Sequence, residues 1–264
     1  MSADPAETDM VAAGSGEFVQ SFARGLAVIR AFDATHPELT LSEVAQRAGA
    51  SRAAARRFLL TLEALGYVRS TDRAFALTPR VLELGYSYLS ALSMPEIAQP
   101  HLERLSHELD QSSSLAVLDG ADVVYVARVP TRRIMNVSIT IGSRFPAHAT
   151  SLGRVLLAGL PPAEREEVLR TGGDLRAFTS RTVTDVDALL AELTLVAERG
   201  WALVEGELDE GLRSIAAPVH DRRGRVVAAV NVSMSDRGSA ARDAQVVAAL
   251  LRAVVAIDAD LAAG

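Results

Sequence analysis

The sequence predicts two domains of different class: an N-terminal all-α winged helix-turn-helix with a small β-wing, and a C-terminal α+β domain with an antiparallel sheet. Three observations predict this arrangement. A capped helical hairpin spans residues 40–68, a short alternating segment follows it, and beyond residue 96 repeated short strands are mixed with helices. The predicted boundaries are 1–17 for a disordered tail, 18–78 for the first domain, 79–95 for a linker helix and 96–264 for the second domain.

The helical hairpin is marked by its capping residues. Thr40 and Glu43 have the spacing of a capping box, so a helix is expected to start at about Leu41. Gly49 has the backbone freedom to end that helix, and Ser51 can cap the next one after a turn of a few residues. The result is two short helices that meet at a steep angle.

The second helix of the hairpin separates apolar from cationic positions. Its apolar residues recur at threes and fours, at Ala55, Phe58, Leu59, Leu62 and Leu65. The rest of its circumference carries Arg52, Ala53, Arg56, Arg57 and Thr61. Small residues near the start of the helix would let its backbone approach a duplex, and the arginines could reach phosphates or guanine edges. A hairpin with surface arginines also occurs in all-α domains that bind no nucleic acid.

The segment after the hairpin favours the DNA-binding interpretation. Residues 67–77 read as a small β-hairpin, in which Tyr67 and Phe75 pack inward while Arg69 and Arg73 project toward a DNA backbone or minor groove. The residues expected to contact DNA are Ser51, Arg52, Ala53, Arg56, Arg57, Thr61, Arg69 and Arg73.

Two further helices flank this motif. Residues 21–32 carry an apolar stripe of Phe22, Leu26, Ile29 and Phe32, which is expected to pack across the back of the helix-turn-helix. After the wing, residues 79–95 form the linker helix, with a broad apolar pattern at Val81, Leu82, Leu84, Gly85, Tyr88, Leu89 and Leu92. Such a face has to be covered, by the first helix of the chain or by a second subunit.

Charge is distributed unevenly along the chain. The formal net charge is −6, and all 27 basic residues are arginine. Residues 18–92 nevertheless hold nine arginines against six acidic residues, a local charge of +3, whereas residues 1–17 carry −4 and residues 93–264 carry −5. Positive charge confined to the helix-turn-helix segment is what a DNA-reading module joined to an acidic partner domain requires.

Composition also bounds the class of protein. The chain has no cysteine, so neither a disulfide framework nor a thiolate zinc site is expected. No apolar run reaches the length of a membrane span, and the N-terminus lacks the basic and apolar regions of a signal peptide. We therefore expect a cytoplasmic protein with no membrane partner, no metal and no cofactor.

The second domain begins with a helical pattern at Ile97, Leu102, Leu105 and Leu109. Strands are then predicted at residues 113–118, 123–129, 135–141, 201–204, 214–220 and 226–234. Helices are predicted at 151–160, 163–170, 186–199 and 240–261. Helices that flank a mostly antiparallel sheet indicate a sensor-like domain.

Catalytic patterns are weak in this sequence. The five histidines form no zinc-binding helix pair, and the chain has no nucleophile elbow, phosphate loop or dinucleotide fingerprint. His148 beside Thr150 and Ser151 could act as a base, although a histidine ahead of a helix more often has a structural role or lines a cavity. The alternative function is accordingly a small-molecule hydrolase or isomerase that uses His148 with Glu205 or Glu207.

The order of winged helix-turn-helix, linker helix and α+β domain resembles the IclR family of bacterial transcription regulators over nearly the whole chain. The most specific local match is a motif in the second domain, at Gly200, Glu207, Ser214, Ile215, Ala216, Val219, His220 and Asp221. One position departs from the pattern, because Val204 stands where the family has Asp or Ser. The resemblance implies a GAF-like effector-binding domain, operator DNA as a partner and assembly into a homodimer or a dimer of dimers.

Residues 128–159 and 207–219 are similar to a subgroup of the family that regulates the β-ketoadipate, protocatechuate or 4-hydroxybenzoate pathways. This similarity implies a small carboxylate effector, either an aromatic acid or its ring-cleaved dicarboxylate. Carried over by position, the effector pocket comprises Ile134, Val137, His148, Ser151, Leu152, Leu212, Ser214, Asn231 and Ser233. Arg133, Arg144 and His148 are candidates for a second anionic contact. The functional hypothesis is a one-component regulator in which the effector biases the angle between the two domains.

Overall fold

The computed structural model describes residues 18–71, 73–84, 93–131, 139–172, 175–234 and 239–263. The chain divides into two compact units, residues 1–90 and 91–264, and each is described by itself. Among the described residues, no helix is long and apolar enough to cross a lipid bilayer.

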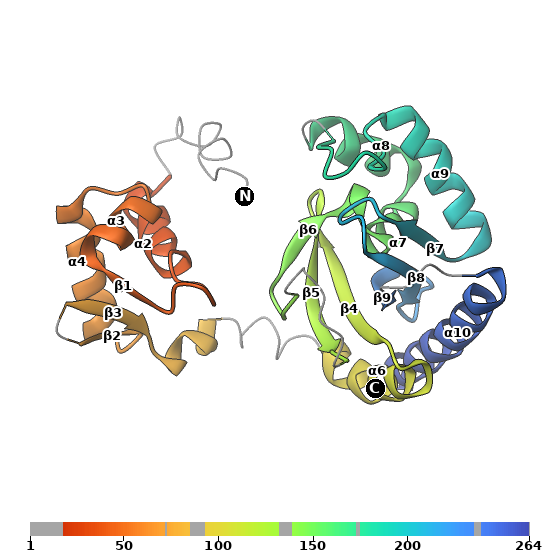
Figure 1. Cartoon of the computed structure of the whole chain (residues 1–264), viewed down its shortest axis with the longest axis horizontal. Helices are drawn as coiled ribbons and strands as arrows, with labels where there is room; N and C mark the ends of the chain where they lie inside the picture. Colours follow the sequence, from red (N-terminus) through yellow and green to blue (C-terminus); the bar gives the residue numbers. More distant parts are fainter. Residues whose placement is uncertain are drawn as a thin grey trace. The chain divides into compact units, whose positions relative to one another are not determined.

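The first unit contains the predicted helix-turn-helix and wing (Figure 1). Its elements are α2 (Gln20–Arg30), β1 (Glu38–Thr40), α3 (Leu41–Arg47), α4 (Arg52–Ala64), β2 (Val68–Thr71), β3 (Ala74–Leu77) and the 3-10 helix η1 (Pro79–Val81). The sheet has three strands in the order β1-β3-β2, all antiparallel. The strand β1 was not predicted, because three residues ahead of a helix carry no periodicity of their own.

The capping box of α3 is formed as predicted. The Thr40 amide donates to Glu43 Oε2 at 2.7 Å, and the Glu43 amide donates to Thr40 Oγ1 at 3.4 Å. The bonds from Thr40, led by the one from its amide, lower the pKa of the Glu43 carboxyl. These reciprocal bonds satisfy amides that the first turn of a helix cannot satisfy itself, so α3 begins at Leu41.

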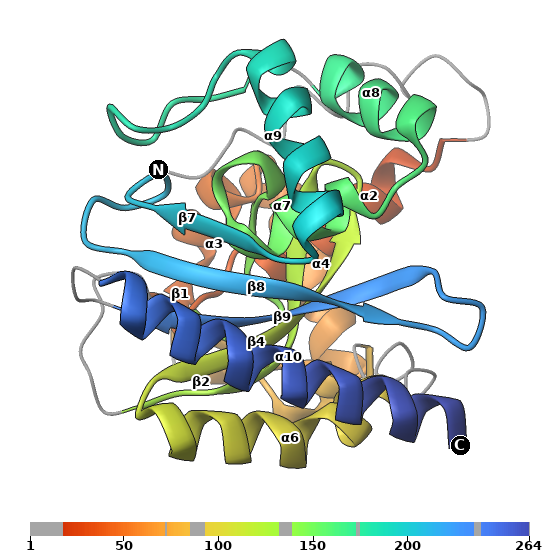
Figure 2. The same ribbon diagram turned by 90° about the vertical axis from the view of Figure 1, so that its right-hand side faces the viewer.

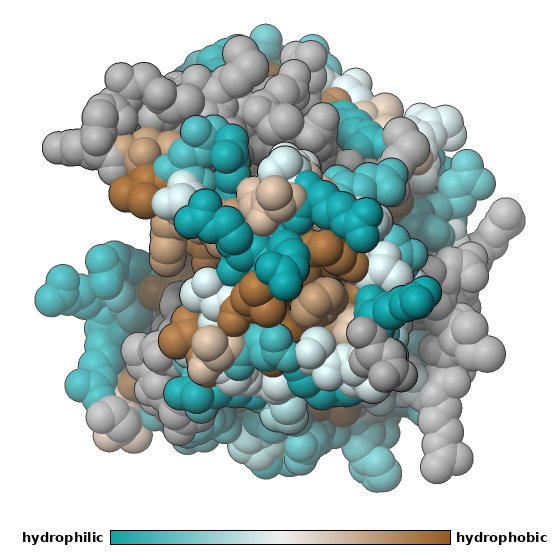
Figure 3. Space-filling model, turned by 90° about the vertical axis from the view of Figure 1, so that its left-hand side faces the viewer, coloured by the Kyte–Doolittle hydropathy of each residue, from teal (hydrophilic) through white to brown (hydrophobic). Residues whose placement is uncertain are grey.

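The core of the first unit corrects two of the predicted packing faces. Val28, Phe32, Val44, Leu59 and Val68 are buried together, with Tyr67 and Phe75 packed against them. Three side chains assigned to packed faces are instead exposed, namely Phe22 (68%) and Leu26 (43%) on α2, and Leu65 (51%) after α4. Leu65 lies beyond the last residue of α4, so it no longer follows the apolar stripe of that helix. Figure 3 shows hydrophobic surface among hydrophilic side chains on one face of this unit.

The predicted linker helix is described only at its start. Helical residues 82–84 follow η1, while Gly85, Tyr88, Leu89 and Leu92 lie outside the described residues. The next helix, α6 (Ser93–Leu109), begins before the predicted boundary at residue 95, and Pro95 lies in its first turn. A proline is tolerated there because the amides of the first turn have no partner within the helix.

The second unit is built on a six-stranded antiparallel sheet in the order β6-β5-β4-β9-β8-β7. Its strands are β4 (Ser112–Asp119), β5 (Asp122–Val129), β6 (Arg144–Pro146), β7 (Ala202–Glu205), β8 (Arg213–His220) and β9 (Val226–Met234). The strand predicted at residues 135–141 is wrong at its described end, since Ile139–Ile141 belong to no strand and the short β6 follows instead. Gly142, at a φ of 85°, turns the chain ahead of β6.

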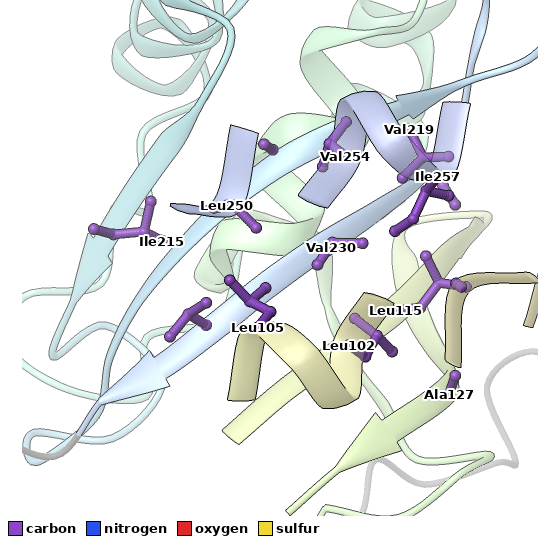
Figure 4. Close-up of a cluster of buried hydrophobic side chains, with 14 of the residues drawn as sticks. Leu102, Leu105, Leu115, Ala127, Ile215, Val219, Val230, Leu250, Val254 and Ile257 are labelled. Carbon is purple, nitrogen blue, oxygen red and sulfur yellow. The ribbon is translucent and has the colours of Figure 1, made fainter. Parts of the chain in front are cut away.

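Helices cover both faces of this sheet. Figure 2 shows α6 and α10 (Ala240–Ala263) side by side across one face, and Figure 4 shows Leu102 and Leu105 of α6 with Leu250 and Ile257 of α10 in the core beneath them. The opposite face packs against a second core formed by η2 (Ala147–Ala149), α7 (Ser151–Ala158), α8 (Pro162–Thr171) and α9 (Val186–Arg199). Strand residues therefore alternate between two buried faces.

Candidate functional site

The turn of the helix-turn-helix places the start of α4 at the surface. Gly49 has a φ of 60°, a left-handed conformation that glycine adopts at little cost, and the Ala50 amide donates to the Ala45 carbonyl at 2.9 Å. Ser51 then caps α4, because its hydroxyl accepts a hydrogen bond of 3.2 Å from the Ala54 amide. Ala53 behind this cap is exposed, so no bulky side chain covers the first turn.

The predicted arginines of α4 are exposed and unpaired. Arg52, Arg56 and Arg57 contact no carboxylate among the described residues. Arg47 on α3 behaves differently, since its guanidinium donates to the Ala31 carbonyl at 2.7 Å and pairs with Asp33 at 2.5 Å. The cationic face of α4 is thus available to a ligand, whereas Arg47 connects α3 to the end of α2.

The other predicted contact residues have partners within the unit or lie at its edge. Thr61 is exposed, but its hydroxyl donates to the Arg57 carbonyl at 2.9 Å. Arg69 on β2 pairs with Glu38 of β1 at 3.0 Å and also reaches the Thr71 hydroxyl at 3.1 Å. Arg73 is exposed at the tip of the wing. Arg69 would therefore have to exchange an exposed ion pair for a DNA contact.

A cavity lies in the second unit between the sheet and α7. It is lined by Tyr125, Ala149, Thr150, Val204, Leu208, Leu212, Ser214, Asn231 and Ser233. Register explains why residues so distant in sequence meet, because Val204 is opposite Ser214, and Ser214 is opposite Ser233. The space that the centre of a water molecule can occupy is about 10 Å³, room for roughly one water.

Four of the predicted pocket residues line this cavity: Leu212, Ser214, Asn231 and Ser233. Ser151 is fully buried just behind the lining, where its hydroxyl bonds the Ser214 hydroxyl at 2.8 Å. Leu152 and His148 do not line the cavity, since Leu152 packs in the core under α7 and the His148 ring bonds the Arg176 carbonyl at 3.0 Å. Ile134 and Val137 lie outside the described residues, as does Arg133.

The remaining lining residues were not predicted as pocket residues. Val204 was noted from the sequence only as a departure from the family pattern. In the structure it lines the cavity, opposite Ser214 in the pairing of β7 with β8. Tyr125, Thr150 and Leu208 carried no separate signal. Tyr125 is brought in by the pairing of β4 and β5, where a register shift between Leu115 and Ala116 interrupts the alternation expected along a strand.

The polar groups of the cavity are incompletely paired. Asn231 is only 2% exposed, and its Nδ2 donates to Ser233 Oγ at 3.2 Å while its Oδ1 has no partner among the described residues. Buried polar atoms without partners are rare in folded proteins and cost free energy, so Oδ1 marks a place for a ligand donor or a water. Burial raises the pKa of the Tyr125 hydroxyl to about 12, against an opposing effect of Arg128, so the hydroxyl stays neutral at physiological pH.

Beside the cavity, a buried ion pair holds the loop that follows β7. Arg154 on α7 is 1% exposed and pairs with Glu207 at 2.6 Å and with Glu192 at 2.9 Å, while its Nε donates to the His148 carbonyl at 3.0 Å. Burial raises the pKa of the Glu207 carboxyl even though Arg154 lowers it. The same loop brings Leu208 and Leu212 to the cavity.

These contacts also bear on the alternative catalytic site. Glu207 is held by Arg154 and by the Val183 amide at 3.2 Å, and the exposed Glu205 pairs with Arg181 and Arg213 at 3.4 and 3.3 Å. The His148 ring is bound to a backbone carbonyl, and desolvation lowers its pKa. None of the three side chains contacts another, so the structure does not bring the proposed base and acids together. Within the described ranges, no group of three His, Asp or Glu side chains could hold a metal ion.

Comparison with known proteins gives the same two units. Residues 21–72 match the family described as the IclR helix-turn-helix domain, and residues 86–259 match the C-terminal domain of the bacterial transcriptional regulator IclR. The Pca regulon regulatory protein of Pseudomonas putida is 44% identical over 232 residues, which cover 88% of this chain and 79% of that relative.

Two solved structures are similar over most of the chain. A transcriptional regulator from Rhodococcus sp. RHA1 is 53% identical with a TM-score of 0.82, and the alignment covers 92% of this chain and 98% of the other. An IclR homolog from Microbacterium hydrocarbonoxydans, crystallised with 4-hydroxybenzoate, is 28% identical with a TM-score of 0.83, covering 92% of this chain and all of that one.

Proposed function

We propose a function from one premise: this chain belongs to the IclR family of bacterial transcriptional regulators. The winged helix-turn-helix binds double-stranded operator DNA, and the cavity of the second unit binds a small organic acid of aromatic catabolism that controls this binding. The observation that carries the proposal is the exposed face of α4, where Arg52, Arg56 and Arg57 have no partner among the described residues. Exposed arginines at the capped start of a helix are placed to contact the phosphates or base edges of a duplex.

In this proposal α4 enters the major groove with its N-terminal turn. Ser51 and Ala53 permit close approach of the backbone, and Arg52, Arg56 and Arg57 contact phosphates or guanine edges. Thr61, Arg69 and Arg73 contact the DNA backbone around this helix. Replacing an arginine that reads a guanine would cost about 1–3 kcal/mol at that base pair, whereas losing a phosphate contact would weaken all sequences equally.

The effector site is proposed to be the cavity between the sheet and α7. Val204, Leu208, Leu212 and Tyr125 offer an apolar bed for an aromatic ring, and the amides at the N-terminus of α7 favour a carboxylate next to Ser151. The similarity to the Pca regulon regulatory protein and to the homolog crystallised with 4-hydroxybenzoate supports an aromatic acid or its ring-cleaved product as the class of effector.

The size of the cavity supports a coupled mechanism. About 10 Å³ holds no more than a water, so an aromatic acid can bind only to a conformation in which the cavity is larger. A ligand that binds one conformation in preference shifts the population toward it, and if operator affinity differs between the two conformations, the effector controls DNA binding.

Self-association completes the proposal. A homodimer, or a dimer of dimers, would present two copies of α4 to the two halves of a palindromic operator. The exposed Phe22 and Leu26 of α2 support this, since adjacent apolar side chains on a helix are commonly covered by a second subunit.

The DNA-binding part can be tested by gel shift with a fragment of the promoter region of the gene. We expect wild-type protein to shift the fragment, with an affinity that falls steeply as salt rises because phosphate contacts release counterions. An Arg56→Ala/Arg57→Ala variant should lose at least tenfold in affinity and show a shallower salt dependence. Arg30→Ala, which removes an exposed arginine of α2, is the matched control. Unchanged affinity of the double variant would remove α4 as the recognition helix.

A further inference from the structure

Arg128 is a partly buried arginine of the second unit that is not paired with a carboxylate among the described residues. Arg128, near the end of β5, is partly buried, and its Nη1 donates to the Ser114 hydroxyl at 3.1 Å. No carboxylate among the described residues pairs with it, and desolvation by burial lowers the pKa of its guanidinium. A guanidinium carries five donors, so Arg128 keeps most of its hydrogen-bonding capacity for another partner.

Register places this guanidinium beside the cavity. Ser114 is opposite Arg128 on one side and opposite Asn231 on the other, so the three residues form one row across β5, β4 and β9. Side chains directly opposite each other on one face of a sheet lie about 5 Å apart at Cβ. Arg128 is also electrostatically coupled to Tyr125, which lines the cavity. Arg128 and Asn231, whose Oδ1 is unpaired among the described residues, therefore flank Ser114 on the same face of the sheet.

We propose that Arg128 and Asn231 together recognise a hydroxyl group at the end of the effector opposite its carboxylate, which makes Arg128 a specificity-determining residue. A hydroxyl accepts one hydrogen bond and donates another, and this is the complement of a guanidinium donor beside a free amide oxygen. The inference rests on the proposed function, because it assumes that the cavity binds an aromatic acid.

The dimensions of the site agree with such a ligand. Ser114 and Ser214 are separated by two strand spacings and one two-residue step along a strand, about 12 Å in all. Ser214 contacts Ser151 at the N-terminus of α7, where the carboxylate is proposed to bind. This span suits a benzoate with a para oxygen and one hydrogen bond of about 2.8 Å at each end.

Three other arginines of the second unit are paired with carboxylates. Arg144 pairs at the surface with Asp119 at 2.5 Å and with Asp122 at 3.3 Å, Arg154 is held by Glu207 and Glu192, and Arg213 is held by Glu205 and Asp243. Recruiting any of these to a ligand would leave a carboxylate unpaired. Arg144, one of the arginines considered from the sequence for a second anionic contact, is therefore a suitable control.

The test is calorimetric titration of the full-length protein with benzoate and with 4-hydroxybenzoate. We expect wild type to bind 4-hydroxybenzoate about tenfold or more tightly than benzoate, and Arg128→Met to bring this ratio close to one while benzoate affinity stays near the wild-type value. Arg128→Lys, which keeps a donor and a charge, should retain an intermediate ratio. Arg144→Met should keep the wild-type ratio.

Two results would overturn the inference while the proposed function stands. The ratio could survive in Arg128→Met, or this variant could lose both ligands equally, which would indicate a structural role only. Absence of binding of either acid to wild-type protein would remove the proposed effector class and this inference with it. A gel shift of the promoter fragment on the same samples would still test the DNA-binding function separately.

Discussion

The arginines of α4 and the arginine at the centre of α7 differ in everything that surrounds them. Arg52, Arg56 and Arg57 lie on an exposed helix face and contact no carboxylate in the part of the chain that the structure describes, whereas Arg154 is 1% exposed and bound to Glu207, Glu192 and a backbone carbonyl. The same side chain serves as a surface charge in the first unit and as an internal connector in the second. An arginine indicates a ligand-binding site when the fold leaves its guanidinium donors unpaired, as at Arg128.

The largest expected effect follows from removing the internal connector. Arg154→Met would leave the buried Glu207 carboxylate without its partner, which costs about 3–5 kcal/mol for a buried pair. Urea unfolding followed by circular dichroism should report this loss in the transition of the second unit. The Arg154→Met/Glu207→Gln variant should recover part of it, because the unpaired charge is gone. A loss below about 1 kcal/mol in the single variant would contradict the assigned role.

A smaller effect is expected where α7 approaches η2. A Cβ at Gly153 would lie 2.1 Å from the Ala147 carbonyl oxygen, so Gly153→Ala forces α7 away from the backbone that Arg154 also contacts. Overpacking of this kind costs about 1–3 kcal/mol. A second Gly→Ala substitution at Gly120 would not be a matched control, because the positive φ of Gly120 would itself strain an alanine. The control is therefore Ala121→Ser, in the turn whose Ala121 carbonyl accepts from the Ala147 amide. Wild-type stability of Gly153→Ala would show that α7 tolerates displacement.

His148, in η2 beside α7, should make the stability of the second unit depend on pH. Burial lowers the pKa of His148, so the unfolded chain, where this group titrates near 6.5, binds a proton more readily than the folded protein does. The free energy of unfolding therefore keeps its full value with respect to His148 above about pH 6.5. It decreases as the pH falls below that value, by at most about 1.4 kcal/mol per pH unit. His148→Gln should flatten this part of the unfolding profile, and His107→Gln on the exposed side of α6 provides the matched histidine substitution for comparison. An unchanged slope in His148→Gln would refute the assignment.

The smallest effect is expected at α4. Arg56→Ala and Arg57→Ala remove exposed side chains that have no side-chain partner among the described residues, so each should change the free energy of unfolding by less than about 0.5 kcal/mol. Thermal unfolding of the variants beside wild type would measure this. A clear loss of stability would mean that these arginines hold the fold, and the contrast between the two units would then fail.

Local signals were sufficient for much of the fold. The capping box at Thr40 and Glu43 and the cap at Ser51 act within one helical turn, so the positions of α3 and α4 could be predicted from the sequence. The strand β9 was predicted with its observed bounds, Val226–Met234, because a turn and a long apolar run delimit it. These elements depend on neighbours in sequence, and sequence patterns describe such neighbours well.

Long-range pairing decided the rest. Tyr125 reaches the cavity through a register shift in the pairing of β4 with β5, and the burial of Arg154 depends on Glu207, 53 residues later. Neither feature has a periodic signature in the sequence. Ser214, Asn231 and Ser233, which the family resemblance assigned to the effector pocket, line the cavity, whereas the His148 ring bonds the Arg176 carbonyl instead. Position in the sequence alone does not show which way a ring points. Phe22 was assigned to a packed face for the similar reason that periodicity does not identify the surface that covers a stripe.

The central claim is that one chain couples a DNA-binding helix to a cavity for an aromatic acid. Fluorescence anisotropy of a labelled promoter fragment, titrated with the full-length protein in the presence and absence of 4-hydroxybenzoate, tests it most directly. We expect saturable, salt-sensitive binding whose affinity changes by about fivefold or more when the acid is bound. Identical affinity with and without the acid, under conditions where calorimetry shows the cavity to be occupied, would contradict it.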